Sequence, residues 1–171
     1  REGFNLVATS NSVDEGVHSM SAALKRRMDF EEIRPIRHLN DEIDVVLREV
    51  ARANRRAGID VALEQSVVEV LVTIFHELRN GQTLDGRSTD RLAGAALSTA
   101  EAVSVAHAAS LNAWYYGGGA MTVEHMMHHV IGSALKDQPE DRRRLKHYFD
   151  TTVAPRKGEH WQQAWALRSL I

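Results

Sequence analysis

From Pro35 onward, apolar residues recur every three or four positions, and this periodicity constrains the fold more than any other feature of the sequence. Apolar side chains at that spacing fall on one face of an α-helix. We therefore predict successive helices, with breaks near Gly58, Gly81, Gly117 and Pro139, over about 40–57, 63–79, 88–115, 122–136, 139–153 and 159–170. The stretch 88–115 is rich in alanine, the residue with the highest helix propensity.

Polar residues at the expected helix starts support this division. Asn40 precedes the acidic pair Asp41 and Glu42, an arrangement that suits an N-cap and the first turn of a helix. Ser88 and Thr122 stand in the corresponding place before two later helices. We expect these three residues to cap the helices that follow them.

The residues before Pro35 follow a different pattern. Phe4–Thr9 reads as a short buried strand, and Phe30–Ile36 reads as another. A short helix around Ala22–Arg27 is expected between them. The chain should therefore be mainly α-helical, with two strands confined to its N-terminal part.

The composition excludes several classes of protein. A hydrophobic content of 43% is enough for a core, and a net charge of −2 gives no general attraction to nucleic acid or to anionic membranes. There are no cysteines, and therefore no disulfides and no thiolate metal site. No apolar run approaches the ~20 residues that span a bilayer. We expect a cytoplasmic protein without a membrane or nucleic-acid partner.

A polar triplet ends the first predicted strand. The stretch that begins at Asn5 contains the apolar run Leu6-Val7-Ala8 and then continues with Thr9, Ser10 and Asn11. Ligands of open α/β sheets bind at the carboxyl ends of the strands, where an amide can orient a water molecule or contact a phosphate. Taken alone, Asn11 is a weak signal, because an asparagine at a strand end is usually only a turn former.

Paired arginines end the short helix that precedes the second predicted strand. Arg26 and Arg27 follow Ala23-Leu24-Lys25 and precede Met28-Asp29-Phe30. An arginine that reaches a neighbouring subunit's nucleotide can neutralise charge on a transferring phosphoryl group. The plainer alternative is a solvated basic helix end, which the helix dipole favours.

Together, the run from Phe4 to Ile33 resembles the AAA+ ATPases from the sensor-1 strand to the strand after the arginine finger, and most closely their MoxR branch. The shared order is a hydrophobic strand, Ala-Thr-x-Asn, an acidic-Gly loop, and Ala-Leu-Lys-Arg-Arg before a strand. Ser12 and Met28 stand where the family often has Pro and Phe. The resemblance implies that residues 1–37 carry the last two strands of the α/β P-loop core. Residues 38–171 would form the helical lid, with an additional helical element after about 117.

The resemblance also implies roles for individual residues. Asn11 would be sensor 1, and Arg27, or its neighbour Arg26, would be the arginine finger. Arg91, with Arg87 as the alternate, would be the sensor-2 residue that reaches the bound nucleotide from the start of a lid helix. A helix N-terminus and an arginine both favour phosphate, although Arg87 and Arg91 could equally be surface charges.

Two nucleotide-binding motifs are missing from the chain. It contains no Gly-x-x-x-x-Gly-Lys-Ser/Thr, and no apolar strand ends in Asp-Glu as a magnesium-holding Walker B strand would. In the family, both motifs precede the sensor-1 strand. We therefore expect a longer parent protein to bind ATP and Mg²⁺, and this chain alone to bind no cofactor and to hydrolyse no ATP.

The resemblance implies a parent that assembles as a ring, expected to be a hexamer, and acts as a chaperone-like machine. Its partners would be von Willebrand factor A domain proteins and client proteins. One alternative is the AAA+ motor of a restriction-type, nucleic-acid-linked system, which the lack of a basic stripe disfavours. Another is a non-enzymatic helical interaction module. A phosphate-binding loop encoded upstream would support the two AAA+ hypotheses and exclude the non-enzymatic module.

Three further clusters have simpler explanations than a functional site. His125 and His129 lie four residues apart, with His128 beside them, but no third metal ligand is evident, and we predict no metal. The aromatic residues around Trp114 and Trp161 are expected to serve mainly in packing. The run 142–144, three arginines, reads as a solvated helix face.

Overall fold

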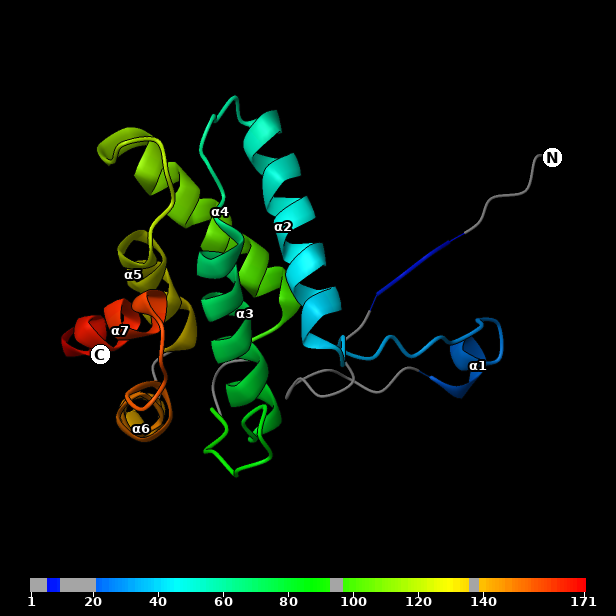
Figure 1. Ribbon diagram of the computed structural model, residues 1–171. Coiled ribbons are helices and arrows are strands. Elements are labelled where there is room, and N and C mark those ends of the chain that lie inside the picture. The colour runs from blue at the N-terminus through cyan, green and yellow to red at the C-terminus, as the bar shows by residue number, and fades with distance from the viewer. Residues whose placement is uncertain (1–5, 10–20, 93–96, 136–138) are drawn as a thin grey trace. The chain divides into compact units, whose positions relative to one another are not determined.

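The computed structural model describes residues 6–9, 21–92, 97–135 and 139–171, and it is mainly helical, as predicted (Figure 1). The chain divides into two compact units, residues 1–34 and residues 35–171. Each is described by itself. None of the helices in the described residues is long and apolar enough to cross a membrane.

In its described residues, the first unit contains one short helix, α1 (Ala22–Lys25), which Ser21 caps by accepting a hydrogen bond from the amide of Leu24. The predicted strands are not formed in its described residues: neither Leu6–Thr9 nor the stretch 28–34 belongs to a β-ladder. Apolar side chains of both stretches are exposed, Val7 to 90% and Ile33 to 89%. A strand is held by hydrogen bonds to a neighbouring strand, and the described residues of this unit offer none. The two predicted strands are therefore not formed in the described residues; Phe4 and Asn5, which begin the first predicted strand, lie outside them.

The second unit is a bundle built around one buried helix. Its elements are α2 (Leu39–Arg56), α3 (Gln65–Asn80), α4 (Thr99–Tyr116), α5 (Val123–Ala134), α6 (Pro139–Tyr148), a π-helical turn η1 (Phe149–Val153), α7 (Glu159–Ala166) and a 3₁₀ turn η2 (Leu167–Leu170). Helix α3 packs against α2, α4, α5 and α7, and Figure 1 shows it in the middle of this unit. Its residues from Val70 to Leu78 are all buried, as expected for a helix that is covered on every side.

The predicted helix starts are partly confirmed. Thr122 caps α5 by accepting a hydrogen bond from the amide of His125. Asn40, however, lies inside α2, because that helix begins one residue earlier and His38 takes the N-cap position without a side-chain bond.

The largest difference concerns the alanine-rich helix, which was expected to begin at Ser88. Helix α4 begins eleven residues later, at Thr99, where Ser98 and Glu101 form a capping box. Ser88, although a good cap by type, already pairs with Gln82 in an antiparallel bridge. The preceding loop therefore keeps the chain at Ser88 out of a helix.

The single helix predicted over 139–153 is also interrupted. Helix α6 ends at Tyr148, and the amide of Ala154 bonds to the carbonyl of Phe149 with the wider spacing of a π-helix. Single π-helical turns of this kind are rare and are frequently found at functional sites. Here the turn buries Phe149, Thr152 and Val153.

Candidate functional site

The two candidate finger arginines lie at the end of α1. Arg26 is the C-cap residue of this helix, and Arg27 follows it; both are exposed. An exposed guanidinium is available to a partner, which is the condition that a residue acting on a neighbouring subunit must meet. The predicted sensor-1 residue, Asn11, lies outside the described residues.

A tight loop follows α3 and carries Arg87, the alternate candidate for the sensor-2 residue. The amide of Thr83 donates to the carbonyl of Arg87 at 2.8 Å, and the amide of Arg87 donates to Thr83 Oγ1 at 2.9 Å. The Arg87 side chain pairs with Asp85 at 2.9 Å and remains 59% exposed. A surface pair of this kind contributes little to stability. Arg87 is thus an exposed arginine near the tip of an ordered loop.

Arg91, the main candidate for the sensor-2 residue, lies at the C-terminal end of α3 and not at the start of α4. Its Nε donates to the main-chain carbonyl of Arg79 at 2.8 Å. Its aliphatic stem crosses Gly81, where an added Cβ would lie 2.5 Å from Arg91 Cγ. The expected position at a helix N-terminus is therefore wrong, because α4 begins only at Thr99. The position found is electrostatically favourable, since the last carbonyls of a helix carry partial negative charge.

A buried carboxylate lies beneath this region. Glu42, in the first turn of α2, is 0% exposed. Its two oxygens accept a bidentate pair from Arg79, at 2.9 Å from Nη1 and 2.7 Å from Nη2. Thr99 Oγ1 donates to Oε1 at 2.8 Å, and His76 Nδ1 lies 3.2 Å from Oε2. Burial by itself would raise the pKa of Glu42, but hydrogen bonds from Arg79, Thr99 and His76 outweigh it and hold the pKa below its ordinary value.

Arg79 also binds the segment that leads into α4. Arg79 Nη1 donates to the carbonyl of Leu97 at 2.9 Å. Leu97 has φ of 47°, a left-handed conformation that is unfavourable for leucine, and it is completely buried. Ser98, the next residue, is the N-cap of α4. The direction in which α4 leaves this point therefore depends on a strained residue whose carbonyl is fixed by Arg79.

A second buried carboxylate, Glu77, lies on the same part of α3. It accepts hydrogen bonds from the hydroxyl of Tyr148 at 2.5 Å, from the guanidinium of Arg156, and from the amide of Leu84 at 2.9 Å. Arg156 also stacks over the ring of Trp161, 4.2 Å from its centroid. The Glu77 carboxylate therefore links the C-terminal end of α3 to the loop that follows it, to α6 and to the segment before α7.

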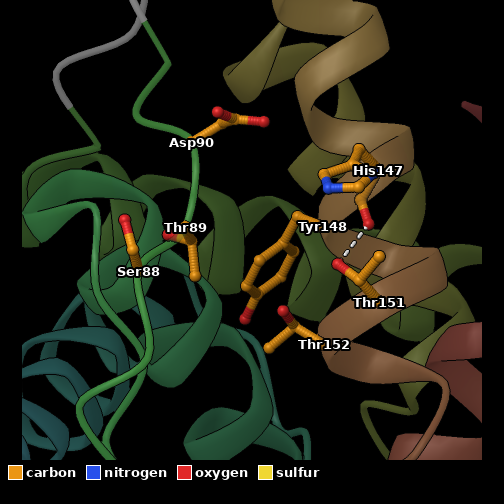
Figure 2. Close-up of a pocket in the computed structure, with 7 residues that line it drawn as sticks. All are labelled: Ser88, Thr89, Asp90, His147, Tyr148, Thr151 and Thr152. Carbon is orange, nitrogen blue, oxygen red and sulfur yellow. Dashed lines mark hydrogen bonds between the residues drawn. The ribbon is translucent and has the colours of Figure 1, made fainter.

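A small polar pocket opens beside this cluster (Figure 2). It has a volume of about 120 Å³ and is lined by Ser88, Thr89, Asp90, His147, Tyr148, Thr151 and Thr152. In Figure 2 the segment 88–90 faces α6 and η1 across it, and Thr151 Oγ1 donates to the carbonyl of His147 at 2.7 Å. A space of this size suits a few water molecules and is too small for a nucleotide.

The C-terminal domain of the YehL-like AAA+ ATPases matches residues 40–171 of this chain. The chain belongs to the YehL-like AAA+ ATPases. It is 43% identical to YehL of Escherichia coli strain K12, in an alignment that covers all of this chain and 47% of that protein. The chain thus spans about half the length of the curated relative it matches. No solved structure matches it.

The AAA+ class that the N-terminal motifs predicted is thereby confirmed, whereas the finer MoxR assignment remains a prediction. The matched region of this YehL-like chain runs to residue 171 and so includes the helices after about 117. It also includes Arg87, Arg91 and the polar clusters around α3. The arginine pair Arg26 and Arg27 precedes it.

Sequence reasoning missed the most connected residues of this AAA+ domain. Glu42 was read only as a first-turn acid, and Arg79 and His76 were not singled out. A signal was present for Arg79 and His76, since both occur in the largely apolar helix α3, but their spacing from Glu42 along the chain gives no indication that they meet it. Glu42 is separated by 34 and 37 residues from its two partners in α3, His76 and Arg79.

One member of the histidine cluster, His125, has a structural role. His125 completes a capping box with Thr122, and its ring packs against Gly117, where an added Cβ would lie 2.9 Å from the ring. Burial, and then the nearby His128 and His125, lower the pKa of His129. Among the described residues, no group of three or more histidine, aspartate and glutamate side chains could hold a metal.

Proposed function

We propose that this chain is the C-terminal part of an ATP hydrolase that works as a ring, expected to be a hexamer, and remodels or activates partner proteins in the manner of the MoxR branch. The observation that carries the proposal is the AAA+ family membership of residues 40–171, joined to the sensor-1 and arginine-finger motifs that precede them. ATP and Mg²⁺ would bind mainly to the part of the longer protein that carries the phosphate-binding loop. Von Willebrand factor A domain proteins and client proteins are the proposed partners.

Within this scheme, Arg27 is the arginine finger, with Arg26 as the alternate, and Asn11 is sensor 1. The exposure of both arginines at the end of α1 supports a role directed at another subunit. Asn11 would act inside its own subunit, where an amide at a strand end can orient the attacking water.

Arg91 is the proposed contact from the helical domain to the nucleotide, with Arg87 as the alternate. Both are exposed arginines on one ordered segment, which the loop bonds and the Arg79 carbonyl hold in place. Guanidinium groups pair well with phosphate oxygens because they offer several donors in a planar fork. The position of Arg91 at the end of α3 requires that nucleotide approach this end of the helix, and not the N-terminus of α4.

The proposal is tested by ATPase rates of the full-length protein. Because an arginine finger contributes ~10³–10⁵ in rate, Arg27→Ala should nearly abolish turnover while ATP binding is retained. Arg34→Ala is a matched control, since Arg34 is another exposed arginine of the same unit and its ion pair among the described residues is a surface one, with Glu32 at 3.6 Å. Normal turnover in Arg27→Ala with a loss in Arg26→Ala would shift the finger by one residue. Normal turnover in both would remove the finger from the proposal.

A further inference from the structure

The buried pair of Glu42 and Arg79 has more partners than an ordinary ion pair. The carboxylate has four polar contacts in the described residues, all with residues of two other helices: two hydrogen bonds from Arg79, one from Thr99, and a contact with His76 Nδ1. Glu42 is fully buried, and the side chain of Arg79 is only 10% exposed. The pair therefore connects the start of α2, the end of α3 and the start of α4 at one point.

Stability alone does not account for such a pair. Removing two charges from water costs nearly as much as their attraction returns, and apolar side chains of similar volume often stabilise a fold at least as well. What a buried bidentate pair supplies is a single defined geometry. Here the pair fixes the relative positions of the start of α2, the end of α3 and the start of α4.

Arg79 binds one chain segment through its main chain and another through its side chain. Its main-chain carbonyl accepts from Arg91 Nε at 2.8 Å, and its guanidinium donates to the carbonyl of Leu97 at 2.9 Å. The described residues on either side of 93–96 are thus attached to the same arginine. Since Leu97 is left-handed, its conformation must be maintained by the bonds around it.

We propose that Glu42 is a positioning residue, which holds Arg79 so that the Arg91 side chain and the start of α4 keep one arrangement on the end of α3. The inference rests on the proposed role of Arg91 at the nucleotide. Glu42 itself touches no nucleotide, because it is covered on every side. Its effect on turnover passes through Arg79.

The first test is residue-resolved amide hydrogen exchange in this 171-residue chain. Glu42→Gln keeps the shape and one acceptor oxygen but removes the charge that holds Arg79. Exchange at Arg91, Leu92 and the first turn of α4 should rise by about tenfold or more, while exchange in α5 and α7 stays the same. Asp44→Asn, which removes an equal charge from an exposed position of the same helix, should change neither region.

A milder variant covers the case in which Glu42→Gln fails to fold. Thr99→Val removes one donor to Glu42 and leaves the pair with Arg79 intact, so it should raise exchange in the first turn of α4 alone. If either variant raises exchange by the same factor throughout the bundle, Glu42 merely supports the fold and the proposal is overturned. Unchanged exchange in the first turn of α4 would also overturn it.

The second test separates this inference from the proposed function. In the full-length protein, Arg91→Ala and Glu42→Gln should each raise the KM for ATP by about tenfold with a smaller change in kcat, and the double variant should be no worse than Arg91→Ala. If Arg91→Ala leaves KM unchanged, the proposed role of Arg91 fails whatever the exchange data show. If Arg91→Ala raises KM and Glu42→Gln does not, the positioning role fails while the proposed function stands.

Discussion

The hydroxyl of Tyr148 lies 2.5 Å from Oε2 of Glu77, where neither side chain reaches solvent. The bond joins residues 71 positions apart and fastens the end of α6 to α3. Burial, and then the charge of Glu77, raise the pKa of Tyr148 well above its ordinary value. The hydroxyl therefore stays protonated and donates a hydrogen bond to Glu77. Tyr148 is therefore one of the donors that make a buried carboxylate tolerable.

Tyr148→Phe should lower the free energy of unfolding by about 1–3 kcal/mol, because Glu77 loses a donor while the ring still packs edge-on against Phe149. Urea denaturation of the 171-residue chain measures the change. Tyr115→Phe is the matched control, since Tyr115 is 73% exposed and should shift stability by less than about 0.5 kcal/mol. Equal effects of the two substitutions would show that the Tyr148 hydroxyl contributes nothing.

Gly81→Ala should destabilise the chain more than Gly58→Ala. Both glycines are left-handed, with φ of 69° and 70°, so both substitutions incur about 1–2 kcal/mol of backbone strain. Only at Gly81 does the new Cβ meet a neighbour, at 2.5 Å from Arg91 Cγ, whereas Gly58 has open space around it. The difference, expected to be about 1 kcal/mol or more, measures the close passage of Arg91. Thermal unfolding with identical midpoints for the two variants would argue against that passage.

Ser98→Ala should lower stability by about 1 kcal/mol, because Ser98 accepts from the amide of Glu101 in the capping box of α4. Ser88→Ala, at the start that the sequence suggested for this helix, should have almost no effect. Comparing the two by urea denaturation thus locates the beginning of the helix. A larger loss at Ser88 than at Ser98 would favour the earlier start.

His129 should make the chain less stable in mild acid. Its pKa is lowered by burial and by His128 and His125, so the folded protein favours the neutral ring. A group with a depressed folded pKa contributes stability that is complete above its unfolded pKa, 6.5 here, and is lost as the pH falls through the folded value. His129→Gln should flatten the fall in urea midpoint below about pH 6.5. His147→Gln, at an exposed position of α6, should leave the profile unchanged; a profile that also stays unchanged in His129→Gln would contradict the assignment.

The sequence predicted the helical bundle well because its signal is local. Apolar periodicity identified α2 and α3, and Thr122 marked the start of α5, since each depends on residues within a few positions of one another. The start of α4 was missed for a non-local reason. Ser88 has the right type for a cap, but its pairing with Gln82 across the loop prevents the helix from beginning there.

The candidate site was less accessible to sequence reasoning. The AAA+ class could be recognised from short motifs, and the family match supports it. The contacts of Glu42 with Arg79 and Thr99 join residues 37 and 57 positions apart, and no single-sequence pattern reports such pairings. Strands were predicted for the first unit from apolar content, which cannot indicate whether a partner strand is present.

Subunit mixing in the full-length protein tests the AAA+ ring most directly. If Arg27 is the finger, as proposed, Arg27→Ala supplies an intact phosphate-binding loop without a finger, and a variant with that loop disabled supplies an intact finger. Each should be nearly inactive alone, because a missing finger costs ~10³–10⁵ in rate. If Arg27 acts across the subunit boundary, mixing the two should restore part of the ATPase rate, with a dependence on their ratio. Mixtures that stay as inactive as the separate variants, or an Arg27→Ala protein with a near-normal rate, would contradict the ring mechanism.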